Sequence, residues 1–167
     1  MAESGSNPSP ARDPFSASRS QSDQPGPEYR RQILIVEDNR ADVFLIRESI
    51  TLAAVDAELH VVPDGEKAIQ FFEHADEDPS APCPDLVLLD INLPKREGRE
   101  VLHHMRQSRR CAQAAVLVVT SSDSERDRED MAKFGVKGYF RKPSEYDGFL
   151  KLGEVVKAML EAESPAK

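Results

Sequence analysis

The sequence has little cysteine and no tryptophan: its 167 residues include only two cysteines, Cys83 and Cys111. They do not form a CxxC pair, and none of the four histidines completes a zinc-ligand pattern with them. This excludes the common structural zinc sites. We expect both cysteines to be reduced thiols of a cytoplasmic protein.

The chain also lacks a long apolar run and an excess of basic residues. No stretch is long enough to span a bilayer, and the N-terminal region has no apolar core of a signal peptide. The formal net charge of −8 disfavours general binding to nucleic acid phosphates. The cluster of Arg106, Arg109 and Arg110 is interpreted as a solvated helix end. These features predict a cytoplasmic protein that binds neither membranes nor nucleic acid.

Aromatic residues are scarce at the start of the chain, where Phe15 is the only one before Tyr29. Serine, proline and other small or polar residues dominate this region, so it cannot bury enough apolar surface to order itself. We predict a disordered tail over residues 1–30, one folded domain over residues 31–162 and a short C-terminal tail over residues 163–167.

What the chain does contain is an alternation of buried strands and amphipathic helices. Aliphatic runs at residues 33–36, 86–89 and 115–119 have the pattern of strands buried on both faces of a parallel sheet. Apolar residues at helical spacing separate or follow these runs: Val43, Leu45, Ile46 and Ile50; Ala68, Ile69 and Phe72; Val101, Leu102 and Met105; and Phe149, Leu152, Val156 and Leu160. This order predicts an α/β domain whose parallel sheet is covered by helices on both faces.

Polar side chains of complementary chemistry follow the strands. Glu37 and Asp38 follow the first run, Asp90 follows the second, Thr120 follows the third, and Lys142 follows the segment GYFR. Because ligands bind beyond the carboxyl ends of parallel strands, these groups can together hold a divalent cation and a phosphoryl group. Each residue alone has an ordinary explanation, such as a helix cap for Asp90 or a strand position for Thr120. Their joint occurrence favours a phosphoryl-accepting site.

Four motifs carry a family resemblance: IVEDN (35–39), LVLLDINLP (86–94), VVTSS (118–122) and GYFRKP (138–143). They resemble the receiver domain of bacterial two-component response regulators, of the stand-alone, CheY-like type. The resemblance extends over residues 32–162. It implies a doubly wound, flavodoxin-like (βα)5 three-layer sandwich with a five-stranded parallel sheet of order 2-1-3-4-5.

The same resemblance implies that Asp90 is the phosphoacceptor, whose carboxylate attacks a phosphoryl group to give an aspartyl phosphate. Glu37 and Asp38 would complete an acidic pocket, in which the carboxylates repel one another unless a cation intervenes. Mg²⁺ is the expected ion, held by the side chains of Asp38 and Asp90 and by the backbone carbonyl of Asn92.

The remaining site residues also follow from the resemblance. Lys142 and Thr120 would contact phosphoryl oxygens, the small Ser121 would leave room for them, and Tyr139 would fill the space that opens when Thr120 shifts. A cis bond before Pro143 would aim the lysine into the site. The protein would act as a switch with only slow self-catalysed phosphorylation and dephosphorylation, and not as an enzyme.

The segment EHADEDPSAPCP (73–84) is longer, more acidic and richer in proline than a tight connection requires, which predicts a surface insertion. Together with EDNRADVFLIRESI (37–50) and INLPKREGREVL (91–102), it resembles stand-alone receivers that work with phytochrome-type and other sensor kinases. The resemblance to this subgroup implies a sensor histidine kinase or a phosphotransfer protein as partner, and it favours a homodimer.

Two other functions need to be weighed against this one. A pseudo-receiver, a binding module that is not phosphorylated, is disfavoured because all five expected pocket side chains are present. A haloacid-dehalogenase-like hydrolase would carry a second Asp two residues after the nucleophile as general acid and base, and Asn92 stands at that position. We therefore expect a response regulator that accepts a phosphoryl group from a sensor histidine kinase and switches a protein-interaction surface.

Overall fold

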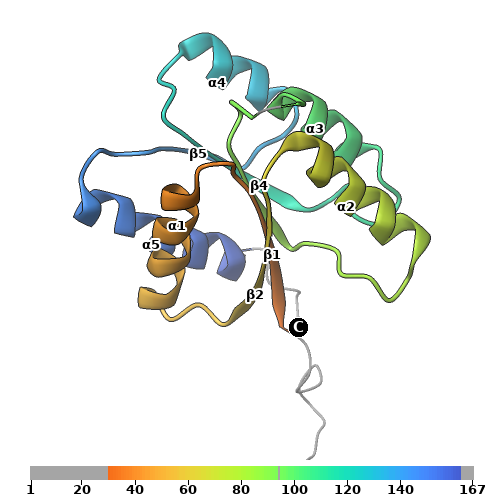
Figure 1. The fold of residues 1–167 in the computed structure, drawn as a ribbon, viewed down its shortest axis with the longest axis horizontal. Helices are drawn as coiled ribbons and strands as arrows, with labels where there is room; N and C mark the ends of the chain where they lie inside the picture. The colour runs from red at the N-terminus through yellow and green to blue at the C-terminus, as the bar shows by residue number, and fades with distance from the viewer. Residues whose placement is uncertain (1–29, 94, 163–167) are drawn as a thin grey trace, which may run out of the picture. The chain divides into compact units, whose positions relative to one another are not determined.

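The computed structural model describes residues 30–93 and 95–162. The predicted tails therefore lie outside the described residues, apart from Arg30. In the described part of the chain five strands alternate with five helices (Figure 1). In chain order they are β1 (Arg31–Val36), α1 (Arg40–Leu52), β2 (Ala57–Val62), α2 (Gly65–Glu77), β3 (Leu86–Leu89), α3 (Gly98–Arg106), β4 (Ala115–Thr120), α4 (Glu125–Ala132), β5 (Gly138–Arg141) and α5 (Tyr146–Ala162).

The strands form one parallel sheet of order β2-β1-β3-β4-β5, which confirms the predicted fold class and strand order. The register brings the carboxyl ends of the central strands into line, because Val36 of β1 pairs with Leu89 of β3, and Leu89 pairs with Val118 of β4. Residues that follow these strands must therefore meet at one edge of the sheet, which we call the carboxyl edge.

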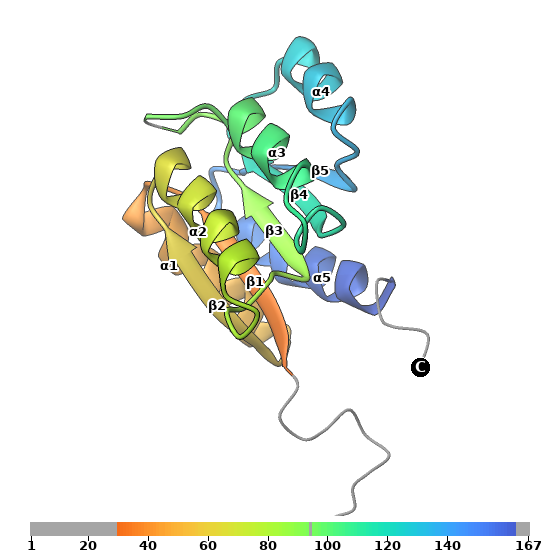
Figure 2. The same cartoon turned by 90° about the vertical axis from the view of Figure 1, so that its right-hand side faces the viewer.

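Alternate residues of the central strands build two separate cores. Leu34 and Val36 of β1 pack into the core beneath α2 and α3, whereas Ile33 and Ile35 pack into the core beneath α1 and α5. All four side chains are fully buried, as expected for a strand covered on both faces. Figure 2 shows the resulting layers, with α2 and α3 on the near face of the sheet and α1 and α5 behind it.

The α1 and α5 helices pack so closely that one position requires glycine. A Cβ atom built on Gly153 of α5 would lie 1.9 Å from the carbonyl oxygen of Ser49 in α1. Ser49 is itself fully buried, and its hydroxyl donates to the carbonyl of Ile46 at 2.8 Å. The two helices therefore pack through direct approach of their backbones.

The cysteines correct one prediction from the sequence. Cys83 and Cys111 form a disulfide with a Cα–Cα distance of 5.7 Å, so the expectation of two free thiols is wrong. The reason is topological: the connections that precede β3 and β4 lie side by side at the amino ends of neighbouring parallel strands. Sequence spacing alone does not show that these two connections meet.

The arginines in the same region are also not a solvated helix end. The guanidinium of Arg110 donates to the carbonyls of Ala75, Asp78 and Ala81, and so it caps α2 and holds the connection that follows it. Arg106 donates in the same way to the carbonyls of Ala112, Ala114 and Phe134. The predicted insertion is thus partly the last turns of α2 and partly a connection fixed by Arg110.

Within the described residues, no helix is both long enough and apolar enough to cross a membrane.

Candidate acidic site at the carboxyl edge

Backbone hydrogen bonds continue the sheet beyond the strand ends and fix the site residues. The amide of Glu37 donates to the carbonyl of Val62 at 3.1 Å, and the amide of Asp90 donates to the carbonyl of Val36 at 3.1 Å. The amide of Lys142 donates to the carbonyl of Thr120 at 2.8 Å. The structure therefore brings together residues at or just after the ends of β1, β3, β4 and β5.

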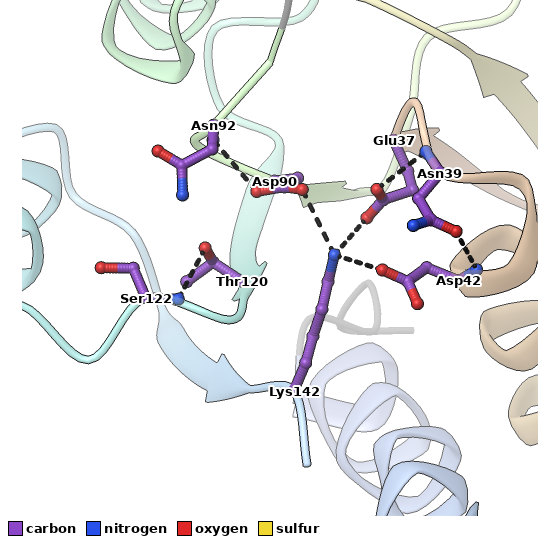
Figure 3. A network of polar contacts seen from close by, with 8 residues as sticks. All are labelled: Glu37, Asn39, Asp42, Asp90, Asn92, Thr120, Ser122 and Lys142. Carbon is purple, nitrogen blue, oxygen red and sulfur yellow. Dashed lines mark hydrogen bonds and ion pairs between the residues drawn. The ribbon is translucent and has the colours of Figure 1, made fainter. Parts of the chain in front are cut away.

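Lys142 is the centre of the polar network drawn in Figure 3. Its Nζ lies 2.8 Å from Glu37 Oε1, 2.7 Å from Asp42 Oδ2 and 3.2 Å from Asp90 Oδ2. The lysine side chain is 9% exposed and that of Glu37 is 2% exposed, so most of this charge is shielded from water. An ammonium carries three protons, and each has a carboxylate oxygen to accept it.

Burial shifts the protonation of this network. The pKa of Glu37 is raised to about 7, because desolvation and the charge of Asp90, which raise it, outweigh the hydrogen bond and the charge of Lys142, which lower it. Desolvation on its own would lower the pKa of the Lys142 ammonium. The hydrogen bonds to Asp42 and Glu37 and the charge of Asp90 outweigh it, so the net shift is upward. The lysine is therefore charged throughout the physiological range.

The carboxylates also form a candidate cation site. Glu37, Asp38 and Asp90 each contribute one oxygen, and these three atoms lie within 4.8 Å of one another. Asp38 is exposed and the other two are buried, so the cluster opens to water on the side of Asp38. Three hard oxygen donors around a partly hydrated space suit Mg²⁺ or Mn²⁺. The residues present thus fit the ion that the sequence predicts.

Asn92 orients the proposed acceptor. Its backbone amide donates to Asp90 Oδ1 at 3.0 Å, while Asp90 Oδ2 faces Lys142 (Figure 3). The two oxygens of this carboxylate therefore have different partners, one from the connection after β3 and one from the residue after β5. The Asn92 side chain is exposed.

Thr120 is fully buried, and its Oγ1 accepts a hydrogen bond from the amide of Ser122 at 3.2 Å. The hydroxyl of half-buried Tyr139 donates to the carbonyl of Ser122 at 3.5 Å, and the guanidinium of Arg128 lies 4.5 Å from the centre of its ring. Ser121 is exposed between them. Ser122 therefore links the predicted switch residues Thr120 and Tyr139, a role that sequence reasoning did not assign to it.

The expectation of a cis bond before Pro143 is wrong. The described residues contain no cis peptide bond, so the bond between Lys142 and Pro143 is trans. Trans is the more stable isomer of an X-Pro bond by about 0.5–1 kcal/mol. The lysine reaches all three carboxylates with this isomer, so the site geometry does not require the cis form.

Sequence reasoning also missed Asp42, the closest partner of Lys142. It lies in the first turn of α1, where Asn39 caps the helix by accepting a hydrogen bond from the Asp42 amide at 3.1 Å. An acidic residue in a first helical turn is common for electrostatic reasons alone. The sequence offered one indication: Asp42 lies only four residues after Asp38, in the first turn of the helix that follows β1.

A groove of about 700 Å³ adjoins the acidic cluster and gives access to it from the side of α4. Its lining includes Asp38 and Asn92 of the acidic site and also Arg99, Arg126 and Asp130. The groove is strongly polar and carries both charge signs. A charged donor group can therefore approach the cluster from this direction.

Comparison with known proteins defines the class of this protein. Residues 33–152 match the response regulator receiver domain, and the chain belongs to that family. The family places the site among the phosphoryl acceptors of two-component systems, which is consistent with the acidic cluster.

Individual relatives point to one branch of the family. The chain is 41% identical to response regulator Rcp1 of Synechocystis sp. over 95 residues, which cover 57% of this chain and 65% of that protein. The structure resembles that of the phosphorylated cyanobacterial phytochrome response regulator RcpA, with a TM-score of 0.73 and 30% identity over 81% of this chain and 97% of that one. It also resembles the Mn²⁺-bound form of Rcp1, with a TM-score of 0.68 and 34% identity over 77% and 92% of the two chains.

Proposed function

We propose that this protein is a response regulator that accepts a phosphoryl group on Asp90. The observation that carries this proposal is the convergence of Glu37, Asp38 and Lys142 on the Asp90 carboxylate at the carboxyl edge. A bound cation and the ammonium of Lys142 would both neutralise the charge that builds up when an anionic phosphoryl group is transferred to this carboxylate.

In the proposed reaction an oxygen of Asp90 attacks the phosphorus of a phosphohistidine in a partner kinase or phosphotransfer protein. The new O–P bond replaces the P–N bond, and the leaving histidine takes up a proton. The side chains of Asp38 and Asp90 and the carbonyl of Asn92 would hold Mg²⁺, which supplies positive charge to the phosphoryl oxygens. Lys142 and Thr120 would donate to these oxygens, and the exposed Ser121 would leave space beside them.

The output would be a change at the surface next to β5. Thr120 and Tyr139 both form a hydrogen bond with the backbone of Ser122. A shift of the threonine hydroxyl toward a phosphoryl group would therefore be transmitted through Ser122 to the tyrosine ring. The ring is only half-buried, which leaves it room to change its exposure. The protein would thus switch a protein-interaction surface, and its own catalysis would be limited to slow phosphorylation and dephosphorylation.

The proposed partner is a sensor histidine kinase of the phytochrome type, or a phosphotransfer protein. This is supported by the likeness to RcpA, which is described as a phytochrome response regulator. We also propose a cytoplasmic location, where such kinase domains act, and a homodimer. Nucleic acid is not among the proposed partners because the net charge is −8.

The proposal is tested by incubating the protein with acetyl phosphate and Mg²⁺ and recording its intact mass. We expect a gain of one phosphoryl group that is lost in Asp90→Asn and in the presence of a chelator. Asp130→Asn, which removes a carboxylate from the adjoining groove, should still take up the group. A wild type that binds Mg²⁺ but takes up no phosphoryl group from acetyl phosphate or from a phosphorylated kinase would contradict the proposal and favour a pseudo-receiver.

A further inference from the structure

Asp42 is the contact of Lys142 that neither the family motifs nor the proposed reaction explains. Its Oδ2 lies 2.7 Å from Nζ, closer than the oxygens of Glu37 and Asp90. The carboxylate comes from a helix, and the cap formed by Asn39 fixes the first turn of that helix. Asp42 therefore holds the lysine toward the α1 side of the pocket, as Figure 3 shows.

The number of protons on the ammonium limits what Lys142 can bind. Its three protons face the three carboxylates of Glu37, Asp42 and Asp90. A phosphoryl group on Asp90 would neutralise that carboxylate and place the negative charge on the phosphoryl oxygens, so the proton that faces Asp90 can follow the charge. A second hydrogen bond from the ammonium to a phosphoryl oxygen requires release of Glu37 or Asp42.

Burial decides which contact is released. The Glu37 side chain is only 2% exposed, so loss of its partner would leave a buried charge without compensation. Asp90 is the point of attachment, and the phosphoryl charge draws the lysine toward it. Asp42 is 22% exposed, so water can solvate its carboxylate once the lysine leaves. The Asp42 contact costs least to break.

We propose that Asp42 is a positioning residue that anchors Lys142 in the unphosphorylated state and competes with the phosphoryl group for it. This inference rests on the proposed function, because it assumes that Asp90 carries the phosphoryl group. Asp42 thereby influences the equilibrium between Lys142 bound to Asp42 and Lys142 bound to the phosphoryl group. Removal of its charge frees one proton of the ammonium and strengthens binding of a phosphoryl analogue.

The test compares Asp42→Asn with wild type in the binding of beryllofluoride, a phosphoryl analogue, at saturating Mg²⁺, followed by fluorine NMR. Loss of a partly exposed ion pair predicts a Kd that falls by roughly three- to tenfold. Asp130→Asn is the matched control, because the Asp130 side chain is 28% exposed, lines the adjoining groove and forms ion pairs with Arg99 and Lys133 and not with Lys142. It should shift the Kd by less than twofold.

The outcomes separate the two proposals. If wild type binds beryllofluoride and Asp42→Asn binds it no more tightly than Asp130→Asn does, the proposed function stands and the role of Asp42 is overturned. A variant that only melts at a lower temperature, with an unchanged Kd, would show that Asp42 merely supports the start of α1. If wild type itself fails to bind beryllofluoride with Mg²⁺, both the proposed function and the role of Asp42 fall.

Discussion

At the amino edge of the sheet, where the strands begin, charged side chains bind mainly backbone groups, whereas at the carboxyl edge they bind one another. Asp76 accepts hydrogen bonds from the Ser108 hydroxyl and from the amides of Arg109 and Arg110, and the Ser108 bond is the main cause of its lowered pKa. At the other edge, burial and the charge of Asp90 raise the pKa of Glu37.

Charged side chains therefore have different roles at the two edges of this domain. At the amino edge hydrogen bonds satisfy Asp76 and Arg110, and a disulfide joins the two connections, so this edge contributes to stability. The carboxyl edge holds an excess of acid around Lys142, which costs stability until a cation or proton arrives. We therefore expect substitutions at the two edges to respond differently to pH and to divalent ions.

The largest effect on stability is expected from Lys142→Met, which removes the ammonium that pairs with the carboxylates at the carboxyl edge. Removal of one partner of a buried ion pair costs about 3–5 kcal/mol, because the remaining charges lose their compensation. Urea unfolding at pH 8 in the presence of a chelator measures the loss. The matched control is Lys151→Met at an exposed position of α5, which should cost less than about 0.5 kcal/mol. A loss below 1 kcal/mol in Lys142→Met would show that the carboxylates do not depend on the lysine.

The next effect concerns the amino edge. Cys83→Ser removes the disulfide to Cys111 and should lower the free energy of unfolding by about 2–4 kcal/mol relative to the oxidised wild type. Phosphoryl uptake should be unchanged, because the site lies at the opposite edge. Reduction of the wild type with dithiothreitol should remove most of the difference. Equal stability of variant and oxidised wild type would mean that the bond adds nothing to the Arg110 contacts.

The third effect, which is the smallest when counted per pH unit, is the pH dependence that Glu37 confers on stability. Its pKa rises from 4.5 to about 7 on folding, so the folded state binds more protons than the unfolded state between these values. The contribution of Glu37 is therefore favourable below pH 4.5 and is lost as the pH rises to 7, with a slope of at most about 1.4 kcal/mol per pH unit.

This slope is measured by urea unfolding at several pH values with a chelator present. Glu37→Gln should remove the contribution, and Asp90→Asn should reduce it, because the charge of Asp90 is one cause of the raised pKa. Mg²⁺ should also reduce it by neutralising the same carboxylates. If Glu37→Gln has the same slope as the wild type, the pH dependence arises elsewhere in the chain.

The sequence predicted those parts of the fold that follow from burial. β1, β3 and β4 are continuous aliphatic runs because both of their faces are covered. The edge strand β2 is only half-buried, and its sequence AELHVV has no comparable pattern. α4 (ERDREDMA) buries only Met131, so it lacks apolar periodicity. These last two elements were expected only through the family resemblance, which supplied the five-stranded order.

The site was predictable to the extent that it lies at strand ends. Parallel strands in register must bring Glu37, Asp90 and Thr120 to one edge, whatever the details of packing. Asp42 was missed because the approach of its carboxylate to Lys142 depends on where α1 begins and how it lies over the sheet. The disulfide was missed because the strand order places the two connections next to each other but does not give their irregular paths, which bring Cys83 and Cys111 together.

The single buried residue of α4 has a consequence for local stability. Burial of one methionine side chain contributes roughly 1.5–3 kcal/mol, so α4 is held to the domain far less firmly than α5, which buries five residues. Amide protons of α4 should therefore exchange with solvent through local opening well before global unfolding. Since α4 contributes residues to the groove that includes Asp38, we expect the groove beside the acidic cluster to be bordered by a helix with low protection factors.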